Sequence, residues 1–205
     1  MKTGSNDGLI IGLGGSIGSG KSVVRRAFEI LSGWHTFDSD AEAKALYFDP
    51  EVRRSLIAEL DTDPVTPEGT LDKAALRLLM NNPGHKAFLE KTVHTTLFRK
   101  LREVRAALPE REILLAESAI LFTSGLAELC HATIAVTAPE EVRKGRVLER
   151  DKEKGELFFE EMENRQKQER IRLEEADYRI LNCDPHSVLL QVDKITKQID
   201  RYVRN

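Results

Sequence analysis

Five short apolar runs punctuate the chain, and longer segments with helical periodicity separate them. The runs are "LIIGL" at 9–13, "WHTF" at 34–37, "EILLAES" at 112–118, "ATIAVTA" at 132–138 and "DYRILN" at 177–182. Short runs of this kind between helical patterns are typical of strands buried in a parallel sheet. The alternation of strand and helix predicts right-handed βαβ units. The predicted fold class is therefore α/β, a parallel sheet flanked by helices.

Two charged, helical excursions interrupt this alternation. The first extends from about residue 41 to 107, and the second covers residues 146–175. We expect a single domain, because 205 residues with 40% hydrophobic side chains suit one core with insertions. Its core would comprise residues 9–40, 108–145 and 176–205. Ligands of open α/β sheets bind at the carboxyl edge of the strands, so we interpret residues 146–175 as a lid over that edge.

The stretch "GSIGSGKS" at 15–22 joins the first predicted strand to a helical pattern. It matches G-x-x-x-x-G-K-[ST], the phosphate loop of nucleotide-binding proteins. Glycines let consecutive backbone N–H groups face an anion, and the helix adds its positive N-terminal end. Lys21 would reach the β- and γ-phosphates and Ser22 would be a ligand of Mg²⁺, which predicts ATP and Mg²⁺ as cofactors. The residues predicted to bind the nucleotide here are Gly15, Gly18, Ser19, Gly20, Lys21, Ser22 and Val23, and Lys21 is also predicted to be catalytic.

Composition narrows the class of partner. The 31 basic and 34 acidic side chains nearly cancel to a net charge of −3, which predicts no nucleic-acid partner. The two cysteines lie in unrelated segments, which favours reduced thiols and a cytoplasmic location. The start "MKTGSNDG" has no apolar segment of a signal peptide, and no apolar run is long enough for a membrane helix. The five histidines have no zinc-type spacing, and nothing in the sequence indicates an obligate protein partner.

A phosphate loop alone serves switches, motors and small-molecule kinases. A GTPase switch would carry N-K-x-D and D-x-x-G, and the sequence contains neither string. A motor ATPase is usually larger and has an aliphatic strand that ends in Asp, whereas "ILLAES" carries Glu117 at that place. Small kinases remain, and these close a lid of arginines over the transferred phosphoryl group.

Several ordered motifs resemble those of the dephospho-CoA kinase family, which are P-loop kinases similar to nucleoside monophosphate kinases. The motifs are "GGSIGSGKS" at 14–22, "FDSDAEAKAL" at 37–46, "PEGTLDKAAL" at 67–76, "NPGHKAFLEKTVHTT" at 82–96, "ESAILF" at 117–122, "LERDKEKGELFFEEMENRQKQ" at 148–168 and "ADYRILN" at 176–182. The chain departs from the family pattern at Ser16, at Thr95 and at Thr123, where an acidic residue is common.

The resemblance implies a P-loop NTP hydrolase fold with a helical CoA-binding part at about 41–107. It implies ATP-dependent phosphorylation of the ribose 3′-hydroxyl of dephospho-CoA, which is the small-molecule partner and gives coenzyme A and ADP in the last step of coenzyme A biosynthesis. It also implies that Asp40 is the general base and that His94 contacts the CoA moiety. From the residues alone, Asp40 could equally be the N-cap of a helix, and His94 could be structural.

Arginines of the second excursion are candidates for the lid. Arg150 is predicted to be catalytic and Arg165 to bind the nucleotide, because a planar guanidinium matches the oxygens of a phosphoryl group. The alternative is a solvated helix stabilised by pairs of opposite charges four residues apart. Asn182 follows the last strand and is predicted to approach the adenine, with a turn residue as the alternative.

Two other functions remain open. One is a different small-molecule or nucleotide kinase on the same fold. The other is a regulatory nucleotide-binding protein without phosphoryl transfer.

Overall fold

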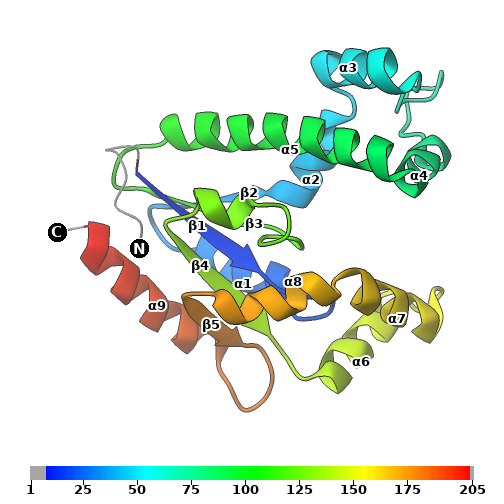
Figure 1. The fold of residues 1–205 in the computed structure, drawn as a ribbon. Helices are drawn as coiled ribbons and strands as arrows, with labels where there is room; N and C mark the ends of the chain where they lie inside the picture. The colour runs from blue at the N-terminus through cyan, green and yellow to red at the C-terminus, as the bar shows by residue number, and fades with distance from the viewer. Residues whose placement is uncertain (1–7, 204–205) are drawn as a thin grey trace. The chain divides into compact units, whose positions relative to one another are not determined.

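A computed structural model describes residues 8–203 (Figure 1). The start of the chain, for which the sequence predicts no signal peptide, lies largely outside these residues. The strands are β1 (Leu9–Gly14), β2 (Trp34–Asp38), β3 (Ile113–Glu117), β4 (Ala132–Thr137) and β5 (Tyr178–Leu181). Each of them lies on one of the five predicted apolar runs.

The chain divides into two compact units. The first unit comprises residues 1–38 and 105–205, and the second comprises residues 39–104. The helices of the first unit are α1 (Lys21–Glu29), α6 (Glu140–Arg150), α7 (Gly155–Arg165), α8 (Lys167–Arg172) and α9 (Val188–Val203), with 3₁₀ turns η1 (Leu126–Leu129) and η2 (Leu173–Glu175). The second unit contains α2 (Ser39–Leu46), α3 (Pro50–Leu60), α4 (Lys73–Asn81) and most of α5 (Pro83–Ala106).

The sheet of the first unit has five parallel strands in the order β2-β3-β1-β4-β5. In its register, Ile11 of β1 lies opposite Leu115 of β3 and Ala132 of β4. Because β1 is central and covered on both faces, its run is apolar at nearly every position, which is why the strand is visible in the sequence. The predicted α/β class is confirmed.

Helices α1 and α9 cover one face of this sheet (Figure 1). Val24 and Phe28 of α1 and Ile195 and Ile199 of α9 belong to one buried cluster with the strands. Burying each such side chain contributes about 1.5–3 kcal/mol. The other face of β1 is packed by Leu121, Cys130 and Leu173, whose side chains lie within about 3 Å of the positions that Cβ atoms would take at Gly12 and Gly14.

The helices of the second unit have well-defined starts. Asp49 precedes α3, and its carboxylate accepts hydrogen bonds from the N–H groups of Glu51 and Val52. Asp72 caps α4 in the same way by accepting from the N–H of Ala75 at 2.9 Å. The buried side chains of this unit include Val52, Leu56, Leu79, Leu89, Val93, Leu97 and Leu101. A binding role for this unit stays a prediction.

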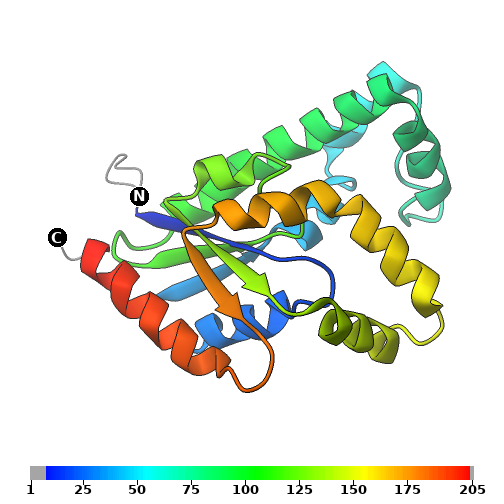
Figure 2. The same ribbon diagram turned by 60° about the horizontal axis from the view of Figure 1, so that its bottom comes forward.

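Helices α6, α7 and α8 follow β4 in succession and return the chain to β5 (Figure 2). They correspond to most of the segment 146–175 that the sequence marks as a lid, and they belong to the first unit. Among residues 8–203, no helix is both long and apolar enough to cross a membrane.

Candidate active site

The phosphate loop, residues Gly15–Ser22, connects β1 to α1. Gly20 is the N-cap of α1 with φ 87°, and Gly18 has φ 74°. Both angles lie in the left-handed region that glycine adopts without strain. The first turn of α1 contains no acidic residue, and a glycine N-cap has no side chain to occupy the first N–H groups. This helix end is therefore suited to an anion.

Close packing also explains these two glycines. A Cβ at Gly18 would lie 2.9 Å from the Cα of Arg143, and a Cβ at Gly20 would collide with the side-chain amide of Asn182. The Asn182 amide donates to the carbonyl oxygen of Ser19 at 2.8 Å. Asn182 therefore contacts the phosphate loop itself, while its predicted contact with adenine stays a prediction.

A pocket of about 480 Å³ opens at the phosphate loop. Its lining brings together the predicted residues Gly18, Gly20, Lys21, Ser22, Val23 and Arg150. Two other predicted residues, Gly15 and Ser19, lie in the same loop and are buried. The Lys21 ammonium group donates to the Gly15 carbonyl at 2.7 Å, so its side chain curls back over the loop.

The two predicted lid arginines differ in their surroundings. Arg150 lines the pocket, and its Nε and Nη2 atoms donate to Asp151 at 2.9 and 2.6 Å. Hydrogen bonds from Arg150 and then Lys154 lower the pKa of Asp151. Arg165 lies outside the lining of this pocket, and its side chain is 66% exposed and paired with Glu161 four residues earlier. In this structure Arg165 therefore has the surroundings of the alternative interpretation, a solvated helix.

Glu117 supplies a carboxylate to the same pocket from the end of β3. Its Oε2 lies 2.7 Å from Nε of Arg25. Burial raises the pKa of Glu117, and the positive charges of Lys21 and Arg25 only partly oppose this, while Asp38 adds to it. The charged form is thus less favourable in the folded protein than in water.

The raised pKa gives the variant Glu117→Gln an expected effect on stability. An acid with a raised folded-state pKa stabilises the fold below its unfolded pKa, and this contribution is lost as pH rises through the folded pKa. The amide resembles the protonated acid, so the variant should melt above the parent at pH 8, and the two should converge near pH 4. Thermal unfolding across this pH range measures it. A variant less stable than the parent at pH 8 would contradict the assignment of burial as the larger effect.

Asp40 and His94 belong to the second unit. Helix α2 begins at Ser39, so Asp40 lies in its first turn, and the interpretation of Asp40 as the N-cap is wrong. A carboxylate in a first turn still interacts favourably with the helix dipole. His94 stacks on Phe98 with ring centroids 5.9 Å apart. Burial lowers the pKa of His94, and Glu90 opposes this shift.

The sequence analysis missed four residues that shape the site, namely Arg143, Glu163, Gln166 and Glu169. Three of them, Glu163, Gln166 and Glu169, are spaced three residues apart, which places such residues on one side of a helical segment but does not tell which side meets the loop. Glu169 is 1% exposed and accepts hydrogen bonds from N and Oγ1 of Thr123, both at 2.8 Å. A carboxylate from α8 therefore meets the loop after β3 at the position where the family pattern has an acidic residue in that loop.

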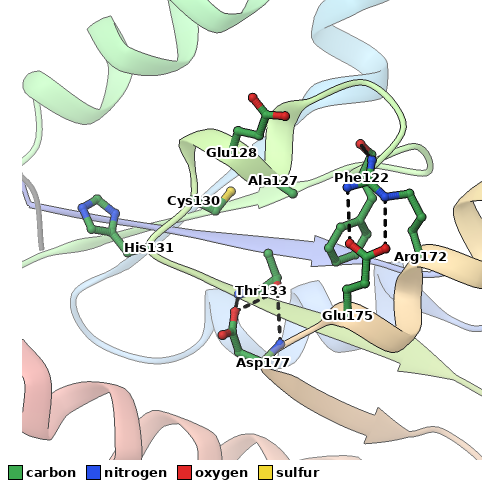
Figure 3. A pocket seen from close by; sticks show the side chains of 9 residues that line it. All are labelled: Phe122, Ala127, Glu128, Cys130, His131, Thr133, Arg172, Glu175 and Asp177. Atoms are coloured by element: carbon green, nitrogen blue, oxygen red, sulfur yellow. Dashed lines mark hydrogen bonds and ion pairs between the residues drawn. The ribbon is translucent and has the colours of Figure 1, made fainter. Parts of the chain in front are cut away.

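A second pocket, of about 450 Å³, lies near η1 and the start of β5 (Figure 3). Several of its polar groups bond to one another or to the backbone. Asp177 accepts from N and Oγ1 of Thr133 at 2.8 and 2.9 Å, and Arg172 pairs with Glu175 and donates to the carbonyl of Phe122. These contacts tie β5 and α8 to their neighbours, which indicates a structural role. Across the described part of the chain, no group of three His, Cys, Asp or Glu side chains could hold a metal ion.

The parallel sheet and the phosphate loop define a P-loop nucleotide-binding protein. Residues 9–186 match the family model described as dephospho-CoA kinase. The chain belongs to the dephospho-CoA kinase family, and the protein is therefore a kinase.

A curated relative agrees with this assignment, and solved structures share the fold. A dephospho-CoA kinase of Porphyromonas gingivalis is 33% identical over 195 residues, covering 93% of this chain and 94% of the relative. Among solved structures, the protein TT1252 from Thermus thermophilus has a TM-score of 0.77 and 28% identity, with 94% of this chain and 97% of the other covered. A dephospho-CoA kinase from Campylobacter jejuni has a TM-score of 0.57 at 19% identity, with 95% and 99% covered, and shares the fold.

Proposed function

We propose that this protein transfers the γ-phosphoryl group of ATP to the ribose 3′-hydroxyl of dephospho-CoA, giving coenzyme A and ADP. The observation that carries the proposal is the pocket in which Lys21, Ser22 and Arg150 meet at the N-terminus of α1. Membership of the dephospho-CoA kinase family supports the choice of acceptor. The two free cysteines agree with the proposed cytoplasmic location.

The phosphate loop would bind the β- and γ-phosphates through backbone N–H groups and the Lys21 ammonium group. Phosphoryl transfer involves little covalent chemistry for the protein, so positioning and charge stabilisation supply most of the catalysis. Arg150 would place its guanidinium against the transferred group by exchanging its contact with Asp151. The Arg150 side chain is 63% exposed, and ion pairs of exposed side chains contribute little stability.

Magnesium fits the residues at the loop. The Ser22 hydroxyl is a hard oxygen ligand, and among the described residues that line the pocket Glu117 carries the one carboxylate. Ser22 would hold the ion. A bound Mg²⁺ ion would neutralise negative charge on the phosphates, so that the attacking hydroxyl oxygen would be repelled less by them.

Asp40 is proposed as the general base. It follows the carboxyl end of β2 by two residues, and parallel strands bind ligands at that end. The 3′-hydroxyl oxygen forms a bond to Pγ, the bond from Pγ to the bridging oxygen of ADP breaks, and the hydroxyl proton passes to the Asp40 carboxylate. His94 and the helices of residues 39–104 would contact the CoA moiety, and Arg165 and Asn182 stay candidates for the nucleotide.

The test is ADP release from ATP and Mg²⁺ with one acceptor at a time, namely dephospho-CoA, AMP, shikimate or gluconate. We expect release only with dephospho-CoA, with coenzyme A identified by mass. Release with another acceptor would keep the kinase class and overturn the substrate. Tight ATP binding without transfer to any acceptor would favour a regulatory nucleotide-binding protein.

A further inference from the structure

The peptide units at Ile17, in the middle of the phosphate loop, are held by side chains from the helices that follow β4. The N–H of Ile17 donates to Oε1 of Gln166 at 2.7 Å. Its carbonyl oxygen accepts from Nη1 of Arg143 at 3.2 Å. Gln166 lies between α7 and α8 and also lines the nucleotide pocket. The conformation of the loop is therefore coupled to residues more than a hundred positions away in the chain.

Arg143 is itself fixed from several directions. It is 4% exposed, and its Nη1 and Nη2 atoms bind the two carboxylate oxygens of Glu163 at 2.5 and 3.1 Å. Its Nε donates to the carbonyl of Ala138 at 3.2 Å, and its guanidinium carbon lies 5.7 Å from the ring centroid of Phe159. A bidentate pair of this kind has little freedom to turn. Arg143 therefore links α7, through Glu163, to the phosphate loop, through the Ile17 carbonyl.

Glu163 and Gln166 are one helical turn apart, so the ion pair and the amide contact act on Ile17 from the same short stretch of chain. Donors that already point the right way need no reorganisation when an anion binds. We propose that Arg143, Glu163 and Gln166 form one positioning unit, which holds Ile17 on both its N–H and its carbonyl side and so sets the shape of the phosphate site before ATP arrives. This inference rests on the nucleotide-binding role proposed above.

The decisive variant is Gln166→Met, which keeps the length of the side chain and removes the acceptor for the Ile17 N–H. The matched control is Gln168→Met, because Gln168 is an exposed residue of α8. Loss of one hydrogen bond should weaken ATP binding about tenfold and speed hydrogen exchange of the Ile17 amide about tenfold. The control should match the parent in both, and the melting temperatures of all three proteins should agree closely.

Direct titration of the protein with ATP and Mg²⁺ separates this inference from the choice of acceptor. If the parent protein does not bind ATP, the proposed function is wrong. A parent that binds ATP while Gln166→Met binds it equally well would overturn the positioning unit, whether or not Ile17 exchange changes. Tighter binding in the variant would also overturn it, since Gln166 would then compete with the phosphates for the Ile17 N–H.

The ion pair is tested by the double variant Arg143→Met/Glu163→Met, which leaves no buried charge unpaired. If the pair positions the loop, this variant should raise the KM for ATP several-fold, leave the KM for dephospho-CoA unchanged, and speed exchange of the Ile17 amide. A lower melting temperature with parental KM and exchange values would assign the pair to stability alone and overturn its place in the unit.

Discussion

Lys21→Ala should lower kcat by about 10²–10³-fold, the cost of removing one preorganised group that stabilises charge in a transition state. Lys21 lies in the nucleotide pocket beside Ser22 and Glu117. Its ammonium group donates a hydrogen bond to the Gly15 carbonyl over the loop, and a rotation of the side chain can bring it to the phosphates. Steady-state ADP release with dephospho-CoA measures the loss. The melting temperature should change little, because the side chain is only partly buried.

Lys194→Ala is the matched control, since Lys194 is an exposed lysine of α9. This variant should keep parental turnover and stability. If Lys21→Ala also kept its turnover, the assignment of residues 15–22 as the catalytic phosphate site would be wrong. If instead it unfolded, ATP titration of Lys21→Met, which retains the aliphatic stem, would separate packing from charge.

The features that the sequence predicts best are local ones. Strands buried on both faces, such as β1 and β4, are continuous apolar runs, so their positions follow from the chain without knowledge of their neighbours. The phosphate loop is local as well, because its glycines and Lys21 act within eight consecutive residues. Hence the α/β class and the nucleotide pocket could both be predicted from the residues.

Contacts between distant segments could not be predicted in this way. The partners Ile17 and Gln166 are 149 positions apart, and Ile17 and Arg143 are 126 apart. Nothing in the charged run around Gln166 distinguishes a residue that meets the loop from its solvated neighbours. Arg165 shows the same limit, because it is adjacent to Gln166 and yet 66% exposed. A helix turns about 100° per residue, so neighbouring residues of one charged segment can have opposite surroundings.

Asp40→Asn should lower kcat by about 10²–10⁴-fold, the usual contribution of a general base, with the KM for ATP nearly unchanged. The amide keeps the size of the side chain and cannot accept the hydroxyl proton. Asp40 lies in the first turn of α2, where losing the interaction of its negative charge with the helix dipole costs about 0.3–1 kcal/mol of stability. That cost is too small to explain such a loss of turnover. Thermal unfolding alongside coenzyme A formation therefore separates the two roles.

The control for this substitution is Asp61→Asn. Asp61 is exposed at the end of α3 with φ 48°, a left-handed conformation that asparagine tolerates well. The Asp61→Asn variant should retain the parental kcat and melting temperature. Full turnover in Asp40→Asn would remove the base from the mechanism and leave positioning by the phosphate loop and Arg150 as the source of catalysis. Because phosphoryl transfer depends mainly on positioning and charge, the kinase would remain chemically sound in that case, and only the fate of the hydroxyl proton would need another acceptor.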